Sequence, residues 1–292
     1  MVSQAYCVDG RDLSNNSFKV GFRMKGNIVK KKLNQGLPSV GTWLSVSSPF
    51  TSEMMSQVGF DWLVIDMEHN PISIETAGVM VSSIFNSNTV PLVRIPWNTG
   101  ENIKRVLDMG AWGVVVPMVN SREEAERAVS NSKYFPLGNR SIGGSRHALG
   151  FSTSSTEYYK NANNEILLVI QIEHIDAVNR IDEILSVPGI DACFIGPNDL
   201  MSSMGIEPQL ETSKAEVNAV IEQIRKAAER HGIASGIHVP NAESANKRIK
   251  EGFQFVAVSS ELGMMLSKAR SEIAQLVESA LESKTTTQEV RY

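Results

Sequence analysis

The stretch that decides the fold is residues 166–199, ILLVIQIEHIDAVNRIDEILSVPGIDACFIGPND. It contains two apolar runs, 166–173 and 190–196, on either side of a segment with helical periodicity at 175–185. Gly189 immediately precedes the second run, where a glycine readily ends a helix in the left-handed conformation. A strand, a helix and a second apolar strand form the unit that joins neighbouring parallel strands.

The same alternation extends along the chain in both directions. Apolar runs predict eight strands, at 38–45, 60–67, 90–96, 113–119, 166–173, 190–196, 233–239 and 253–259. Helical patterns follow them, at 51–58, 74–86, 101–109, 121–133, 175–185, 214–231, 243–250 and 263–283. We therefore predict an α/β fold, a (β/α)₈ TIM barrel. The alternative is an open doubly wound sheet, but that fold usually has a glycine fingerprint after its first strand, and residues 45–52 (SVSSPFTS) have none.

Composition narrows the class of protein further. Of 292 residues, 42% are hydrophobic and 21% charged, which is typical of a globular protein. The net charge of -4 argues against a general nucleic-acid binder, and no apolar run is long enough to predict a membrane-spanning helix. Two cysteines and an N-terminus without an apolar leader-like run favour the cytoplasm.

The alternation of strand and helix patterns also predicts domain boundaries. We expect residues 1–35 to be a flexible N-terminal extension, 36–283 to form a single barrel domain and 284–292 to be a disordered tail. Within the barrel, residues 134–164 show neither strand nor helix periodicity. They precede the fifth strand, so we expect a long loop at the N-terminal end of the barrel.

Two carboxylates end consecutive predicted strands, Glu173 and Asp199. Active sites of TIM barrels lie at the carboxyl ends of the strands, where such neighbours meet. Two carboxylates without cysteine suit a hard divalent cation such as Mg²⁺ or Mn²⁺. The alternative is that each carboxylate caps the helix that follows it, although Gln171 beside Glu173 adds weight to a site.

Arg94 and His69 are the other candidates at this end of the barrel. Arg94 lies inside an apolar strand, where a guanidinium needs an anionic partner, either a structural carboxylate or a substrate. His69 follows the second strand and is a candidate proton carrier, with a surface or structural histidine as the alternative. No lysine lies in a predicted strand, which disfavours an aldolase that works through a strand-borne Schiff base.

Several segments in fixed order resemble a known family. They are GTWLSVSSPFTSEMMSQVGFDWLVIDMEH (41–69), PLVRIPWN (91–98), VLDMGAWGVVVPMV (106–119), LLVIQIE (167–173) and FIGPNDL (194–200). Together they resemble the metal-dependent class II pyruvate aldolases of the HpcH/HpaI family, over about residues 36 to 275. The resemblance implies a (β/α)₈ barrel of the phosphoenolpyruvate/pyruvate type.

The resemblance also implies roles for individual residues. The general base would be His69 of Asp-Met-Glu-His, assisted by Asp108 of Leu-Asp-Met-Gly, and Arg94 of Leu-Val-Arg would stabilise the transition state. The metal ligands would be Glu173 and Asp199, binding Mg²⁺, Mn²⁺ or Co²⁺. Substrate contacts would come from four residues, namely Arg94, Gln171, Asn198 through its backbone, and Asp199.

The implied reaction is the reversible cleavage of a 4-hydroxy-2-oxo acid into pyruvate and an aldehyde, through a metal-stabilised pyruvate enolate. The implied assembly is a homohexamer, a trimer of dimers that exchange the last helix. A citrate-synthase-like or acyl-CoA lyase using the same metal site is the alternative reaction, and a barrel retained only for binding is the non-enzymatic alternative. This chain departs from the family at Met67, at residues 137–143 (LGNRSIG) and at 259–261 (SSE), which bears on the substrate.

Overall fold

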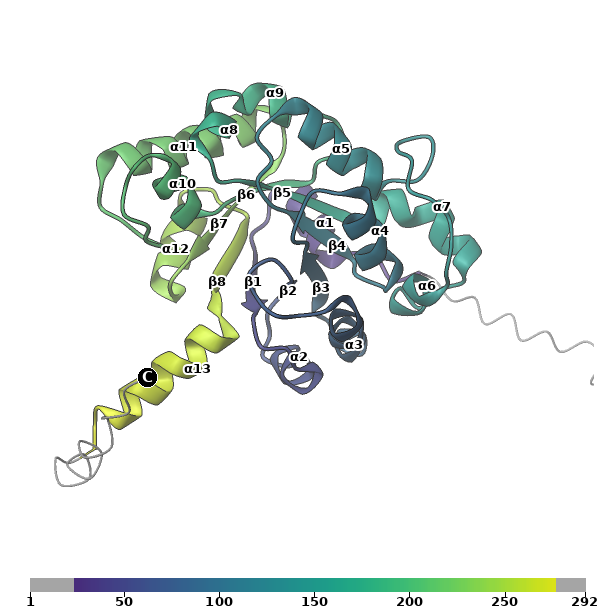
Figure 1. The fold of residues 1–292 in the computed structure, drawn as a ribbon, viewed down its shortest axis with the longest axis horizontal. Coiled ribbons are helices and arrows are strands. Elements are labelled where there is room, and N and C mark those ends of the chain that lie inside the picture. Colours follow the sequence, from purple (N-terminus) through teal and green to yellow (C-terminus); the bar gives the residue numbers. More distant parts are fainter. Residues whose placement is uncertain (1–23, 277–292) are drawn as a thin grey trace, which may run out of the picture.

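Eight parallel strands close into a barrel in which each strand pairs with the next and the last pairs with the first (Figure 1). The computed structural model describes residues 24–276. The strands are β1 (Ser39–Leu44), β2 (Trp62–Asp66), β3 (Val90–Arg94), β4 (Gly113–Val116), β5 (Leu167–Ile172), β6 (Ala192–Ile195), β7 (Ala234–Val239) and β8 (Phe255–Ser260). The predicted barrel is confirmed, and the open-sheet alternative is wrong.

Helices surround the barrel and alternate with the strands. They are α1 (Ile28–Asn34), α2 (Pro49–Met55), α3 (Ile74–Ile84), α4 (Gly100–Asp108), α5 (Arg122–Ser132), α6 (Arg146–Gly150), α7 (Ser155–Glu165), α8 (Ile175–Asn179), α9 (Ile181–Leu185), α10 (Pro197–Ser203), α11 (Ala215–Arg230), α12 (Ala242–Lys250) and α13 (Glu261–Ile273). The helix predicted at 175–185 is two short helices, and α10 was not predicted. Within residues 24–276, no helix is both long and apolar enough to cross a lipid bilayer.

The N-terminal end of the barrel is closed by α1. Val29 and Leu33, one helical turn apart, are buried there, and Asn27 caps the helix by accepting from two backbone N–H groups. The Asn27 amide also donates to the carbonyls of Trp112, which directly precedes β4, and of Glu165, two residues before β5. Residues 28–34 are therefore part of the packed domain, contrary to the expected extension over 1–35. Residues 1–23 lie outside the described residues.

The segment 134–164, expected to be a loop, holds α6 and α7. Its position before β5 agrees with the prediction, but its structure does not. Helix α7 buries only Tyr158 and Ala162, and its other residues are polar, so its helical periodicity was too weak to recognise. Tyr158 packs toward the barrel, because its ring centre lies 5.5 Å from that of Phe151, which stacks on Trp112 just before β4.

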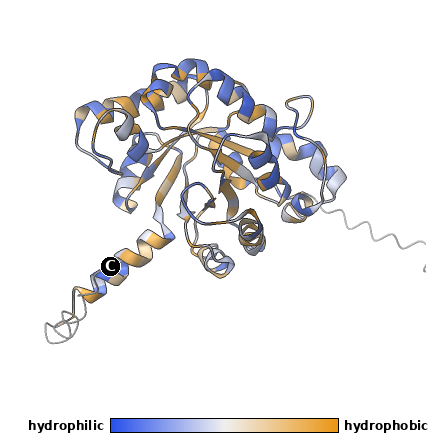
Figure 2. Cartoon of the chain, in the orientation of Figure 1, coloured by the Kyte–Doolittle hydropathy of each residue, from blue (hydrophilic) through white to orange (hydrophobic). Residues whose placement is uncertain are grey.

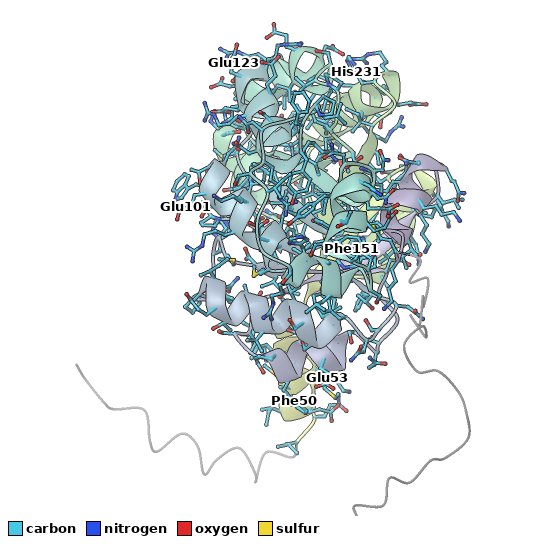
Figure 3. The ribbon with its side chains drawn as sticks, turned by 90° about the vertical axis from the view of Figure 1, so that its right-hand side faces the viewer. Phe50, Glu53, Glu101, Glu123, Phe151 and His231 are labelled. Atoms are coloured by element: carbon cyan, nitrogen blue, oxygen red, sulfur yellow. The ribbon has the colours of Figure 1, made fainter. Side chains whose placement is uncertain are left out.

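Helix α13 leaves the barrel and points away from it (Figure 1). Apolar residues alternate with polar ones along the helix (Figure 2). Met265 is 56% and Leu266 41% exposed. Phe50 on α2 is 69% exposed and lies at the end of the molecule opposite Glu123 and His231 (Figure 3). The remainder of the predicted last helix and the tail at 284–292 lie outside the described residues.

Candidate active site

The carboxyl ends of the strands surround a cavity of about 310 Å³. Its lining includes five residues that the sequence singled out, namely His69, Arg94, Gln171, Asn198 and Asp199. Trp43, Phe194 and His238 provide ring surfaces in the same wall. The cavity is large enough for a small organic acid and lies where TIM barrel enzymes carry their chemistry.

Arg94 is held rigidly at the end of β3 by two carboxylates. The register of β2 and β3 places Arg94 beside Asp66, which accepts hydrogen bonds from Nε and from Nη2, both at 2.8 Å. Glu68 lies 3.1 Å from Nη1, and the Trp43 ring centre lies 4.4 Å from the guanidinium carbon. Burial lowers the pKa of Arg94, but the hydrogen bonds and charges of Asp66 and Glu68 raise it overall, so the side chain remains a cation.

Glu68 connects Arg94 to His69. Its Oε2 atom lies 3.5 Å from Nε2 of His69, whose side chain is mostly exposed at the cavity mouth. Burial raises the pKa of Glu68 to about 7, opposed by the charge of Arg94 and reinforced by the negative charges of Asp66 and Asp199. A carboxyl group beside the imidazole can orient its ring through a hydrogen bond.

Glu173 follows β5 and is buried directly behind the cavity lining, against Gln171 and Gly196, which line it. Gln171 donates from Nε2 to Oε2 at 2.6 Å, and the Met118 backbone N–H donates to Oε1 at 2.8 Å. Met118 has a left-handed backbone, φ 52°. Burial raises the pKa of Glu173 to about 7 against the Met118 hydrogen bond, and the charges of Glu68 and Asp199 raise it further.

Asp199 and Asn198 lie in the first turn of α10, which begins directly after β6. Neither predicted carboxylate is a helix cap, because the cap of α10 is Gly196 without a side-chain hydrogen bond and that of α8 is His174. The capping alternative is therefore wrong for both.

This arrangement fits a divalent cation with few protein ligands. Asp199 is near enough to raise the pKa of Glu173 by its charge, and a cation between them would relieve that repulsion. Gly196 packs against Glu173, where any Cβ would clash with the carboxylate. Among residues 24–276, no three His, Cys, Asp or Glu side chains form a complete cage. Two carboxylates that leave positions for water and substrate are what Mg²⁺ accepts.

Asp108 is not brought to His69 within one chain. It ends α4, which runs from the carboxyl end of β3 back to the start of β4, so it lies at the opposite end of the barrel from His69. There its Oδ1 accepts from Nη2 of Arg140 at 2.6 Å, and Arg140 also donates to the Tyr158 hydroxyl.

Sequence reasoning missed the supporting roles of Trp43, Met118 and Glu68. Trp43 lies in an apolar strand, where an aromatic residue gives no sign of a functional role. Met118 acts through its backbone, which side-chain patterns do not reveal. The position of Glu68 just after a predicted strand and next to His69 indicates a place near the site. Its ion pair with Arg94 could not be predicted, because it depends on the register of β2 against β3.

The Arg94 guanidinium, the His69 imidazole and the Asp199 carboxylate line one cavity, and the Glu173 carboxylate lies directly behind it. Such a site can stabilise a negative oxygen and move a proton at the same time. The sequence profile described as HpcH/HpaI aldolase/citrate lyase matches residues 39–268 of this chain.

Relatives agree with that match. The hydroxypyruvate/pyruvate aldolase of Rhizorhabdus wittichii is 36% identical over 85% of this chain and 98% of its own. The 4-hydroxy-2-oxo-heptane-1,7-dioate aldolase of Shigella sonnei is 35% identical over 85% of this chain and 94% of its own. The crystal structure of an HpcH/HpaI aldolase from Desulfitobacterium hafniense superposes with a TM-score of 0.79 at 33% identity, covering 88% of this chain and 99% of that one.

Both named curated relatives are aldolases, which are carbon–carbon lyases, and this supports an aldolase more than the acyl-thioester alternative. The fold, the cavity and the relatives lead to one conclusion. The chain belongs to the HpcH/HpaI aldolase/citrate lyase family.

Proposed function

We propose that this aldolase cleaves a 4-hydroxy-2-oxo acid reversibly into pyruvate and an aldehyde, and that it requires a divalent cation. The observation that carries the proposal is the buried carboxylate of Glu173. It is held by Gln171 and Met118, directly behind a cavity that Asp199 and Arg94 line. Glu173 and Asp199 would hold Mg²⁺, Mn²⁺ or Co²⁺. When bound, the cation supplies positive charge against the negative charge that develops on the keto oxygen.

Arg94 binds and orients the reacting end of the substrate. A guanidinium has five N–H donors, of which Asp66 takes two and Glu68 faces a third. The remaining N–H groups are free to donate to a substrate oxygen. Because Asp66 fixes the side chain before the reaction, little reorganisation is needed as charge develops.

His69 moves the proton. As a base, its imidazole takes the proton of the 4-hydroxyl group, the bond between C3 and C4 breaks, and the electron pair remains on the pyruvate fragment as its enolate. The aldehyde leaves, and protonation of C3 completes pyruvate. Glu68, 3.5 Å from Nε2 of His69, orients the ring and stabilises the imidazolium that forms.

The remaining site residues would contact the substrate or a neighbouring subunit. Gln171, Asn198 through its backbone, and Asp199 line the cavity and would contact the 2-oxo acid. Because Asp108 lies at the other end of its own barrel, we infer that it serves His69 of a second copy. The assembly would be a homohexamer built as a trimer of dimers, in which neighbours exchange the projecting helix α13 and cover its exposed Met265 and Leu266.

The experiment measures pyruvate release from a panel of 4-hydroxy-2-oxo acids by protein stripped with EDTA and then given Mg²⁺, Mn²⁺ or Co²⁺. We expect release to stop on stripping and to return with the metal. Glu173→Gln should abolish the metal-restored rate, because the neutral amide loses the charge that holds the cation. Exposed Glu123→Gln is the matched control. If metal-loaded protein released no pyruvate from any acid, the acyl-thioester reaction would become the better interpretation.

A further inference from the structure

His238 is a polar side chain in the cavity wall to which neither the family resemblance nor the mechanism above gives a role. It lies on β7 and lines the cavity. Its Nε2 atom lies 3.0 Å from the backbone oxygen of Ser259 on β8. A carbonyl can only accept, so Nε2 carries the ring proton, and Nδ1 of the neutral ring keeps its lone pair.

The backbone conformation of Ser259 holds the hydrogen bond to His238 in place. Ser259 has φ 50°, in the left-handed region that a serine adopts only at a cost. That conformation directs its carbonyl toward the imidazole and fixes the orientation of the ring. Within residues 24–276, Nδ1 has no hydrogen-bond partner. The atom is accessible to solvent, and because the ring lines the cavity, Nδ1 faces that cavity.

His238 is neutral at physiological pH. Burial lowers its pKa to about 4, opposed by the Ser259 hydrogen bond and reinforced by the positive charge of Arg94. The imidazole is therefore a hydrogen-bond acceptor at Nδ1 rather than a cation or a general acid.

Trp43 places His238 relative to Arg94. The Trp43 ring centre lies 4.4 Å from the Arg94 guanidinium carbon and 5.8 Å from the His238 ring centre. All three side chains line the cavity, so His238 lies on the same side of it as Arg94, which donates to a substrate oxygen in the proposed function.

We propose that His238 is a specificity residue whose Nδ1 accepts a hydrogen bond from a hydroxyl group on the carbon beside the keto group. The preferred donors would then be hydroxylated 2-oxo acids rather than pyruvate itself, an inference that rests on the proposed function. A hydroxyl group satisfies the lone pair of Nδ1. Pyruvate has a hydrogen in place of that hydroxyl group and therefore offers Nδ1 no donor.

The test compares 3-hydroxypyruvate with pyruvate on metal-loaded protein. Calorimetry gives the Kd of each acid, and initial rates of aldol addition to propanal give kcat/KM for each. We expect wild-type protein to favour 3-hydroxypyruvate. His238→Leu should lower that preference about tenfold, the effect of one hydrogen bond to a neutral group, with kcat/KM for pyruvate within about twofold of wild type.

Two further variants make the result specific. His238→Asn offers an amide oxygen near the position of Nδ1 and should recover part of the preference. His231→Leu, at a surface ion pair with Asp182, should change nothing. The proposal is overturned if His238→Leu or His238→Asn weakens both acids equally, or if wild-type protein favours pyruvate. Metal-loaded protein that binds neither acid would instead overturn the proposed function, and this inference with it.

Discussion

At the scale of single residues, the fixed orientation of Arg94 depends on Asp66. Both oxygens of Asp66 accept from the guanidinium at 2.8 Å, so Asp66→Asn replaces one acceptor with an amide that faces another donor. We expect kcat/KM for pyruvate release to fall about 100-fold, comparable to losing one aligned transition-state donor, while the metal affinity stays unchanged. The measurement combines steady-state kinetics with metal titration. Glu101→Gln, which removes an exposed partner of Arg105, is the control, and equal losses in both variants would contradict the assignment.

Lys133 gives a prediction about pH and stability. It is buried, donates to the carbonyls of Asn163 and Ile166, and burial lowers its pKa to about 8. Between pH 8 and pH 10.5 the unfolded chain holds this proton more tightly than the folded one, so the contribution of Lys133 to the free energy of unfolding rises with pH. Urea denaturation at pH 7.5 and pH 10 should show this rise in wild type and in the exposed control Lys160→Met. In Lys133→Met the rise should be smaller by a few kcal/mol, and an unchanged rise would rule out the effect.

At the scale of elements, the junction between β6 and α10 determines where the proposed metal ligands lie. Gly196 at this junction has no room for a Cβ, which would clash with the Glu173 carboxylate. Gly196→Ala should push that carboxylate aside, weakening metal affinity at least tenfold while the barrel still folds. Metal titration and thermal unfolding measure the two effects separately. Gly143→Ala, at a glycine whose Cβ would meet nothing, is the control. Unchanged metal affinity in Gly196→Ala would show that Glu173 is not a ligand.

The elements that the sequence predicted share one property, a strong apolar pattern. Strand runs such as 60–67 and 166–173 are mostly buried, so the sequence predicts their positions. The strand ends, where Arg94 and Glu173 lie, are predicted with them. Helix α7 buries only two side chains and gave no such pattern. The hydrogen bonds between Asp66 and Arg94 could not be predicted from the sequence either, because they depend on the register of β2 against β3.

At the scale of the whole molecule, the barrel separates Asp108 from His69 by placing them at opposite ends. If Asp108 serves a neighbouring copy, His69→Ala and Asp108→Ala proteins are each nearly inactive but complement each other. A mixed oligomer contains sites that combine an intact His69 from one parent with an intact Asp108 from the other. Activity after co-refolding, with sedimentation velocity to show that wild type and mixture assemble alike, is the measurement. A mixture no more active than the average of its parents would contradict the shared site.

Trp43 has a spectroscopic consequence. Its indole is buried between the Arg94 guanidinium and the His238 ring, whereas Trp97, one of the other three tryptophans of the chain, is 71% exposed. Indole fluorescence responds to nearby charge, so emission from Trp43 should change when an acid fills the cavity. Substituting the other three tryptophans with phenylalanine would leave a single optical reporter inside the site. Occupancy could then be followed within milliseconds of mixing, without labels and before any carbon–carbon bond is broken.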